Sequence, residues 1–141
     1  HGLTGHSMGG HGALTIGLRN PQMFKSLSAF APICTTLHSP WGQKALGNYL
    51  GEDTATWINH DAAEVARSVG DPAIFSKILV DQGLVDEWLQ DQLKPELLEA
   101  ACAESGLNLE LRRHEGYDHG YYFISTFIED HLRFHVDQLS S

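Results

Sequence analysis

The sequence predicts an α/β fold, in which helices flank a parallel β-sheet and the fold begins at a sharp turn between a strand and a helix. Short apolar runs alternate with longer amphipathic stretches along the 141 residues. Strands that alternate with helices form βαβ units, which build parallel sheets. A Gly-x-Ser-x-Gly pentapeptide at residues 5–9 also requires a strand-to-helix turn. Residues 1–141 therefore read as one α/β domain.

The first half of the chain is predicted to contain a helix, a buried strand, a loop and two short helices. Residues 8–19 have apolar side chains at helical spacing, and proline follows them. Residues 27–32 form an apolar run that is typical of a buried parallel strand. Residues 33–53 are rich in glycine and aromatic residues, so we expect an irregular loop that forms a lid or pocket wall. Thr54 and Asp61 are expected to cap short helices that end at residues 59 and 68.

The second half repeats the alternation of strand and helix. Residues 78–80 are the core of a strand, and residues 90–105 predict a helix with Pro95 in its first turn or at a kink. Residues 107–113 alternate between apolar and polar side chains, as in a strand with one wet face. A glycine-bounded loop follows at residues 116–120, and residues 122–138 predict an amphipathic helix.

Composition excludes several classes of function. The chain has 18 Asp and Glu against 9 Lys and Arg, a net charge of -9, without a basic run. Nucleic acids and anionic membranes are therefore not expected partners, because phosphate binding needs clustered basic residues. No apolar run approaches the ~20 residues of a membrane span. Cys34 and Cys102 lie in apolar surroundings and are expected to be buried free thiols, as in a reducing compartment.

The pentapeptide is the pattern of a nucleophile elbow. Its serine, Ser7, is predicted to stand at the tip of a strained turn, which exposes the hydroxyl and aims the next backbone N–H at a developing oxyanion. Gly5 and Gly9 are expected because a Cβ at either position would collide with the neighbouring strand and helix. Only residues 1–4 precede the motif, too few and too glycine-rich for the whole strand that an elbow needs. We therefore expect this chain to be a fragment of a longer protein.

A serine hydroxyl needs a base, and the base needs a group that orients it. Such partners are expected just beyond the carboxyl ends of the strands. Asp81 and Asp86 follow the strand at residues 78–80, and we favour Asp86 because it lies far enough into the loop to reach a histidine. His114 and His119 follow the next strand, and we favour His119 because it lies in a loop that enters a helix. The order Ser, Asp, His is the one used by this kind of site.

The other histidines and tryptophans have structural interpretations. His6 and His11, beside Ser7, are expected to pack or to form local hydrogen bonds. His131 and His135 are four residues apart on the last helix, a spacing that could hold zinc, but the glutamate of a zinc-protease motif is missing. We therefore interpret both as ordinary histidines on one face of the helix and expect no metal site. Trp41, in the glycine-rich loop, is equally compatible with a pocket wall and with ordinary packing.

These motifs occur together with further short segments. They are GHSMGGHGAL at residues 5–14, SAFAP at 28–32, PWG at 40–42 with YLG at 49–51, DQG at 81–83 with Asp86, and GYDH at 116–119 with YYFI at 121–124. The combination resembles the S-formylglutathione hydrolase family, also called the esterase D family. The resemblance covers essentially all 141 residues but only the C-terminal half of the family's usual length.

The resemblance implies the C-terminal half of an α/β-hydrolase fold that begins at the nucleophile elbow. It implies hydrolysis of the thioester S-formylglutathione to glutathione and formate, the second step of formaldehyde detoxification, together with esterase activity on small acyl esters. It also implies no cofactor, a cytoplasmic location and a homodimer of the full-length enzyme. Carried over residue by residue, it makes Ser7 the nucleophile, Asp86 the acid, His119 the base and the Met8 N–H an oxyanion donor.

The resemblance also says what this chain lacks. In the family the N-terminal half supplies the early strands, the second oxyanion donor and a cysteine near the pocket, a role that belongs to neither Cys34 nor Cys102. Without the early strands the elbow strand would be an exposed edge, which favours pairing or aggregation. The isolated chain is therefore expected to have little or no activity. Trp41 and Lys44 are candidate contacts to the glutathione part of the substrate.

Two other functions stay open. A general carboxylesterase would use the same catalytic residues, and only a comparison of substrates separates it from a thioester hydrolase. The chain could also be a non-catalytic hydrolase-like module, in which Ser7 would not be activated.

Overall fold

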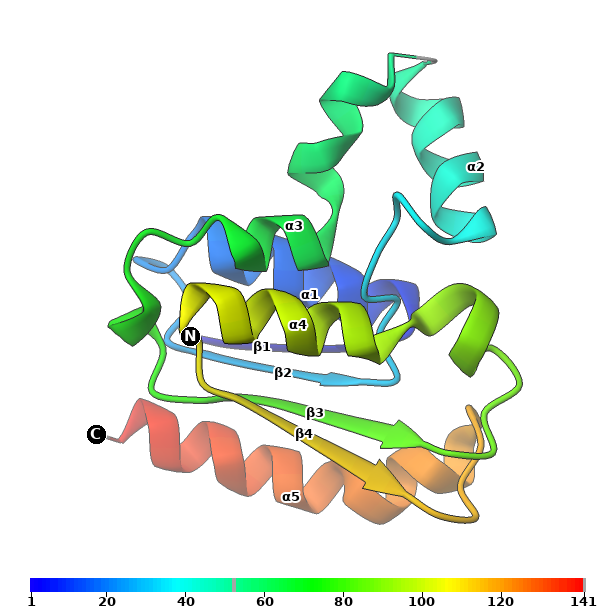
Figure 1. Ribbon diagram of the computed structural model, residues 1–141. Helices are drawn as coiled ribbons and strands as arrows, with labels where there is room; N and C mark the ends of the chain where they lie inside the picture. The colour runs from blue at the N-terminus through cyan, green and yellow to red at the C-terminus, as the bar shows by residue number, and fades with distance from the viewer. Residues whose placement is uncertain (52, 141) are drawn as a thin grey trace.

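A parallel four-stranded sheet forms the centre of the molecule, with the strands in the order β1-β2-β3-β4 (Figure 1). The computed structural model describes residues 1–51 and 53–140. Each strand neighbours the next one in the sequence, so the carboxyl ends of all four lie along one edge of the sheet. The predicted α/β fold is confirmed. The strands are β1 (Gly2–His6), β2 (Ser26–Phe30), β3 (Ile78–Gly83) and β4 (Leu109–His114).

Helices cover both faces of this sheet. α1 (Met8–Arg19), α3 (Ala62–Arg67) and α4 (Pro95–Ser105) lie on one face, and α5 (Tyr121–Leu139) lies on the other (Figure 1). α2 (Pro40–Leu50) and the 3-10 helix η1 (Thr54–His60) stand away from these layers. Two short elements, η2 (Pro72–Ile74) and η3 (Leu89–Leu93), complete the chain.

The core is divided by the sheet into two parts. The larger part lies under α1, α3 and α4, and includes Leu14, Leu27, Val80 and Leu98. The smaller part lies under α5, where Phe123 packs edge-on against Phe30 with ring centroids 6.1 Å apart. Each α-helix against the sheet thus buries one apolar face, as its spacing predicts.

The two cysteines are buried free thiols in the larger core, as predicted. Burial raises the pKa of Cys102 to about 11 and raises that of Cys34 still further, so both thiols stay protonated. An apolar environment that disfavours the thiolate makes a poor nucleophile. Neither cysteine is therefore a candidate for the chemistry of the site.

The segment that leads into the elbow is a strand. Gly2 to His6 form β1, which pairs with β2 along its whole length, from Gly2 opposite Ser26 to His6 opposite Phe30. The first two residues of the pentapeptide are thus part of the strand. Parallel pairing with β2 thus orders even this short, glycine-containing segment, while the expectation that residues 1–4 are only part of the strand stays a prediction.

Part of the predicted loop at residues 33–53 is helical. Ser39 caps α2 by accepting a hydrogen bond from the Gly42 N–H at 3.1 Å, and Pro40 occupies the first turn. Gly42 weakens the helical pattern in the sequence. Glycine is nevertheless required at this position, because a Cβ there would lie 2.4 Å from Thr36 Cα. The helix ends at Gly51, whose φ is 78°.

Two other boundaries differ from the prediction. The helix expected at residues 90–105 is two elements, because Lys94 adopts a left-handed conformation with φ 48° and Pro95 starts α4 as its first residue. Proline has no N–H to donate and so fits a first turn. The cap of η1 is Asp53, which accepts from the Ala55 N–H, rather than Thr54. Asp61 caps α3 as expected, by accepting from the Glu64 N–H.

Candidate active site

Ser7 stands at the junction of β1 and α1 in a strained conformation. Its φ is 58° and its ψ is -116°, values that L residues rarely adopt and that are tolerated where the surroundings enforce them. The Ser7 N–H donates to the Phe30 carbonyl at 3.1 Å, while the Ser7 carbonyl accepts from the N–H groups of His11 and Ile33. The chain is thus anchored on both sides of the hydroxyl, as a nucleophile elbow requires.

The glycines of the motif have unequal roles. A Cβ on Gly5 would lie 2.2 Å from the Gly9 carbonyl oxygen, so the turn between β1 and α1 closes only with glycine there. A Cβ on Gly9 would meet nothing within 4 Å, which contradicts the predicted collision at this position. The crowded second position is Gly10, where a Cβ would lie 2.9 Å from Pro32 Cβ.

Met8 provides the backbone N–H next to the nucleophile. It is the first residue of α1, and the first N–H groups of a helix have no partner within it. The helix dipole adds partial positive charge at this end. The predicted oxyanion donor is therefore placed where a negative oxygen is favoured.

Asp86 and His119 are joined by a hydrogen bond. His119 Nδ1 lies 2.7 Å from Asp86 Oδ2, and Asp86 also accepts from the Trp88 N–H at 2.8 Å and from Gln82 Nε2 at 3.1 Å. Burial by itself raises the pKa of Asp86, but the bonds from His119, Trp88 and Gln82 outweigh it and hold the pKa below its ordinary value. An ionised carboxylate only accepts, so Nδ1 carries the proton and leaves Nε2 of His119 as the basic nitrogen.

The loops that carry Asp86 and His119 are tied to each other. The Leu84 N–H donates to the His114 carbonyl and the Val85 N–H to the Tyr117 carbonyl, both at 3.0 Å. Gly83 permits this approach, because a Cβ there would lie 2.2 Å from the Tyr117 carbonyl oxygen. Both loops therefore lie at the carboxyl edge of the sheet, beside the end of β1 that carries Ser7. In the part of the chain that the structure describes, no hydrogen bond joins the Ser7 hydroxyl to His119.

His6 packs against His119, which the sequence did not predict. The rings have centroids 4.5 Å apart, and His6 Nε2 lies 3.1 Å from the His119 carbonyl oxygen. Burial and the neighbouring His119 lower the pKa of His6. His11, on the other side of Ser7, accepts a hydrogen bond from the Ala62 N–H at 3.1 Å, and burial lowers its pKa to about 4. Both flanking histidines thus pack and form hydrogen bonds, but their partners lie 113 and 51 positions away in the sequence, whereas local partners were expected.

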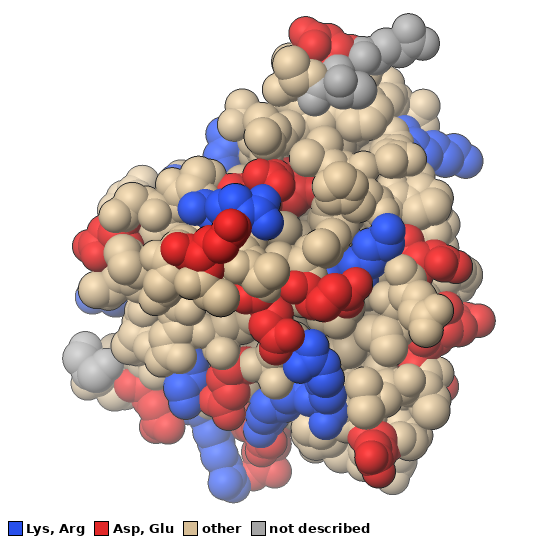
Figure 2. Space-filling model, viewed as in Figure 1, with Lys and Arg blue, Asp and Glu red and all other residues tan. Residues whose placement is uncertain are grey.

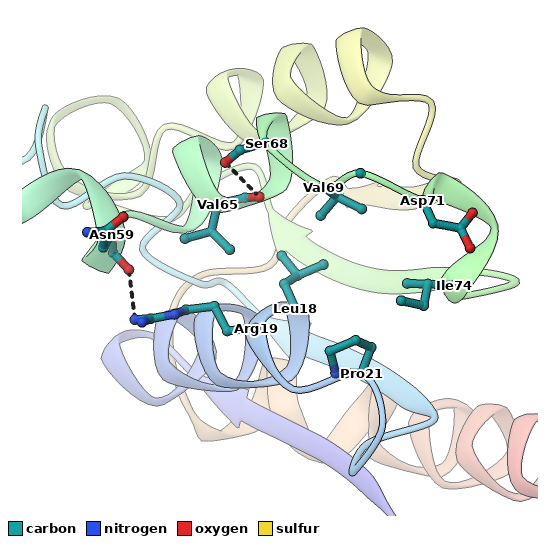
Figure 3. A pocket seen from close by; sticks show the side chains of 10 residues that line it. Leu18, Arg19, Pro21, Asn59, Val65, Ser68, Val69, Asp71 and Ile74 are labelled. Atoms are coloured by element: carbon teal, nitrogen blue, oxygen red, sulfur yellow. Dashed lines mark hydrogen bonds between the residues drawn. The ribbon is translucent and has the colours of Figure 1, made fainter.

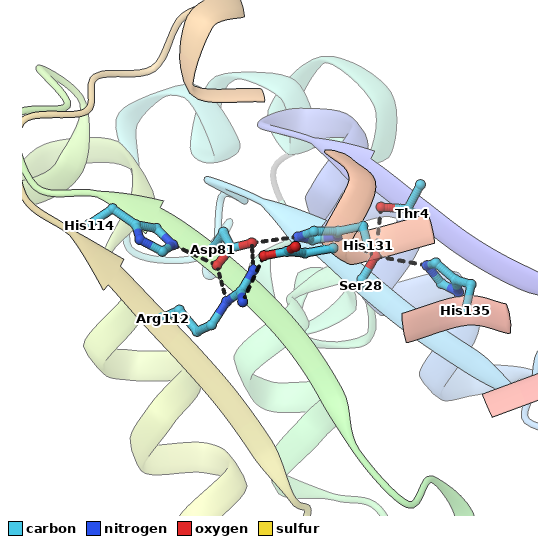
Figure 4. Close-up of polar contacts among 8 residues, drawn as sticks. Thr4, Ser28, Asp81, Arg112, His114, His131 and His135 are labelled. Atoms are coloured by element: carbon cyan, nitrogen blue, oxygen red, sulfur yellow. Dashed lines mark hydrogen bonds and ion pairs between the residues drawn. The ribbon is translucent and has the colours of Figure 1, made fainter. Parts of the chain in front are cut away.

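The alternative acid and base, Asp81 and His114, belong to a different cluster (Figure 4). Asp81 is fully buried under α5 and accepts from Arg112 Nε at 2.6 Å and from Arg112 Nη2 at 2.7 Å. His114 Nε2 lies 2.8 Å from one of its oxygens, and His131 Nε2 lies 2.7 Å from the other. Burial alone raises the pKa of Asp81, but the bonds from His131, Arg112 and His114 hold it well below its usual range. Asp81 therefore has no bond left for His119.

The cluster continues across the sheet to β1. His131 Nδ1 lies 2.8 Å from the Ser28 hydroxyl, which donates to the Thr4 hydroxyl at 2.8 Å (Figure 4). His135 Nε2 lies 2.8 Å from the Ser28 hydroxyl oxygen, and His135 Nδ1 lies 2.6 Å from that of Ser26. His131 and His135 thus lie on one face of α5, as predicted, and that face is turned toward the sheet. Among residues 1–51 and 53–140, no group of three or more His, Cys, Asp or Glu side chains could hold a metal ion.

A hollow of about 480 Å³ opens beside the candidate base. Trp88 in its wall packs on Trp41 of α2, with ring centroids 4.6 Å apart. Trp41 is 38% exposed and adjoins the hollow through Trp88, whereas Lys44 is exposed and does not line it. The lining residues are Val85, Glu87, Trp88, Asp118, His119 and Gly120.

A second hollow, of about 330 Å³, lies between α1 and the segment from α3 to η2 (Figure 3). Arg19 crosses its edge and donates to the Asn59 carbonyl at 3.1 Å. It is lined by none of the candidate catalytic residues, and α1 separates it from the elbow, since Arg19 is the last residue of that helix and Ser7 precedes the first.

Basic and acidic side chains are interspersed on the face shown in Figure 2. Among the described residues, ion pairs join Arg113 to Glu99 at 3.1 Å, Lys77 to Glu110 at 2.9 Å, and Arg67 to Glu64 and Glu104. No helix among the described residues is long and apolar enough to cross a membrane.

The parallel sheet, the strained elbow serine and the His–Asp pair at the same edge define an α/β-hydrolase-type esterase fold. The sequence profile of the esterase family described as "Putative esterase" matches residues 1–134, and the chain belongs to this family.

The chain is similar to several proteins named S-formylglutathione hydrolase. It is 50% identical to the one from Arabidopsis thaliana over 137 residues, which are 97% of this chain and 48% of that protein. It is also 50% identical to the Rattus norvegicus protein over 140 residues, 99% of this chain and 49% of that protein. The solved S-formylglutathione hydrolase from Agrobacterium tumefaciens superposes with a TM-score of 0.92 at 47% identity, over 98% of this chain and 49% of that one. The chain thus spans about half the length of these relatives.

Proposed function

We propose that the protein carrying this chain hydrolyses the thioester S-formylglutathione to glutathione and formate, with Ser7 as nucleophile, His119 as general base and Asp86 as the acid that orients it. The observation that carries the proposal is the Asp86–His119 hydrogen bond of 2.7 Å, at the sheet edge where the strained Ser7 also lies. The similarity to proteins named S-formylglutathione hydrolase supports the choice of substrate. Such a reaction would serve formaldehyde detoxification.

In the first half of the reaction, His119 Nε2 takes the proton of the Ser7 hydroxyl while Oγ attacks the formyl carbonyl carbon. Asp86 holds the imidazole by Nδ1 and stabilises its cationic form. The carbonyl oxygen becomes an oxyanion, which accepts from the Met8 N–H. When the C–S bond breaks, the thiolate takes the proton from His119 and leaves as glutathione. A formyl ester on Ser7 remains.

In the second half, the same base activates water. His119 Nε2 takes a proton from the water as its oxygen attacks the formyl carbon. The proton then passes to the Ser7 oxygen as formic acid leaves, and formic acid releases its own proton to solvent to give formate. We place the second oxyanion donor outside this chain, as the family resemblance implies. Removal of one such donor typically slows the reaction ~10²–10³-fold.

Contacts to the glutathione part must supply the selectivity, because a thiolate is a good leaving group in any thioester. The hollow beside His119 is where we place this part of the substrate. Trp41 is proposed to contact it together with Trp88, on which it packs. The exposure of Lys44 and its position outside the hollow make it a weaker candidate than the sequence suggested.

The experiment compares kcat/KM for S-formylglutathione and for an aryl acetate, with the full-length protein encoded by the gene of this chain. A marked preference for the thioester supports the proposal, whereas equal or better hydrolysis of the aryl acetate favours a general carboxylesterase. Covalent labelling of Ser7 by a fluorophosphonate distinguishes both from a non-catalytic module, because labelling needs an activated serine.

The whole protein is also proposed to be a cytoplasmic homodimer without a cofactor, as the resemblance implies. Residues 1–141 are proposed to form one part of a larger hydrolase domain, with little activity by themselves. Turnover of S-formylglutathione by the isolated monomeric chain, at the rate of the full-length protein, would contradict this last point.

A further inference from the structure

The histidine that precedes the nucleophile contacts the candidate base directly. His6 and His119 are 113 positions apart in the sequence, yet His6 Nε2 lies 3.1 Å from the His119 carbonyl oxygen. The two imidazole rings have centroids 4.5 Å apart and an interplanar angle of 40°. The contact joins the elbow to the loop that carries the base.

The partner atom fixes the tautomer of His6. A carbonyl oxygen only accepts hydrogen bonds, so Nε2 of His6 must carry the proton and donate it. Partial burial and the neighbouring His119 lower the pKa of His6, which keeps the ring neutral at neutral pH. During the reaction His119 becomes cationic, and a second cation 4.5 Å away would oppose that charge. A neutral donor suits this position.

We propose that His6 is a positioning residue for the base. Its Nε2–H holds the main chain of His119 and its ring supports the His119 ring, so that Nε2 of His119 is directed toward Ser7. Asp86 holds the imidazole at Nδ1, 2.7 Å away, while His6 holds the backbone of the same residue at 3.1 Å. Two anchors at different atoms restrict both the ring rotation and the loop position. The inference rests on the proposed catalytic roles of Ser7, Asp86 and His119.

A matched pair of substitutions in the full-length protein isolates the hydrogen bond. Glutamine in His6→Gln carries an amide N–H about as far along the side chain as Nε2, whereas methionine in His6→Met has similar length without a donor. We expect His6→Met to lower kcat about tenfold with little change in KM, and His6→Gln to stay within about threefold of wild type. The same two substitutions at His11 are the control, and both are expected to leave kcat within about twofold.

A second readout does not depend on turnover. The proton between His119 Nδ1 and Asp86 should give a low-field NMR resonance in the wild type and in His6→Gln. In His6→Met the resonance should broaden or disappear, because the ring is no longer held. This pattern in an inactive wild-type protein would refute the proposed function but leave the positioning role intact.

Other outcomes overturn the inference. Equal kcat and equal low-field resonances in His6→Met and His6→Gln, in an active protein, would show that the hydrogen bond does not position the base. If His6→Met does not fold, the ¹⁵N shifts of the His6 ring in the wild type decide. They should report a neutral ring with the proton on Nε2 at neutral pH. A charged ring, or a proton on Nδ1, would contradict the inference.

Discussion

Substitution of Asp81 by asparagine should strongly destabilise the protein. Asp81 is fully buried and accepts two hydrogen bonds from Arg112 and one each from His114 and His131. Asparagine offers one acceptor oxygen, and its amide protons would face donors. Breaking a buried ion pair on one side costs about 3–5 kcal/mol, and we expect the lower end because Arg112 is 29% exposed and can be partly hydrated.

The assay is urea denaturation of the full-length protein, with Asp130→Asn as the matched control. Asp130 pairs with the same Arg112 at 3.1 Å but is 48% exposed, so its loss should cost at most about 1 kcal/mol. Because the folded pKa of Asp81 is lowered, its contribution is present above the unfolded pKa of about 3.9 and is lost as the pH falls through the folded pKa. The difference in the free energy of unfolding between the wild type and Asp81→Asn should therefore become smaller below pH ~4. Equal costs for Asp81→Asn and Asp130→Asn would refute this reasoning.

Two further predictions concern residues that flank Ser7. Burial lowers the pKa of His11 to about 4. The contribution of His11 to the free energy of unfolding is therefore present above pH ~6.5 and is lost as the pH falls from there to 4. In His11→Gln, the free energy of unfolding should lose about 3 kcal/mol less over this pH range than in the wild type. Urea denaturation at several pH values measures this pH dependence, and an unchanged pH dependence in His11→Gln would contradict the prediction. His38→Gln, at an exposed site, is the control and should leave the pH dependence of the free energy of unfolding unchanged. Gly5→Ala should prevent closure of the turn between β1 and α1 and abolish labelling of Ser7 by a fluorophosphonate. The matched control is Gly12→Ala on α1, because a Cβ there meets open space; it should raise the free energy of unfolding by about 0.5–1 kcal/mol. Retained labelling in Gly5→Ala would show that the turn can relax.

The sequence predicted the order of strands and helices because periodicity and terminators are local signals. It missed α2, since Gly42 and Gly47 weaken the helical pattern and the need for Gly42 arises from its contact with Thr36, which is tertiary. The pairing that orders β1 beside β2 is likewise a contact between elements. Local patterns thus gave the elements, while their boundaries depended on contacts between elements.

At the site, the order of Ser7, Asp86 and His119 along the chain was informative, but it left Asp81 as an alternative. Every residue of β3 is buried, so no alternation in the sequence reveals which face Asp81 occupies. Its partners come from β4 and α5, and only the folded chain brings them together. The contact of His6 with His119 is equally invisible, because it spans 113 positions.

The inward orientation of His131 and His135 did have a signal in the sequence. Ser26 and Ser28 recur with a period of two in a strand that is otherwise apolar and buried. Buried hydroxyls need hydrogen-bond partners, and histidines four residues apart on an amphipathic helix could supply them. The need of the buried serine hydroxyls for hydrogen-bond partners would thus have predicted that these histidines face the sheet.

The hydrolysis of S-formylglutathione by the Asp86→Asn variant of the full-length protein tests the central claim most directly. The substitution keeps the size of the side chain but removes the carboxylate that His119 Nδ1 contacts at 2.7 Å, so the imidazole can adopt the wrong tautomer. We predict that kcat falls by about 10³–10⁴-fold while the protein remains folded. Turnover at the wild-type rate would contradict the proposed roles of Asp86, His119 and Ser7.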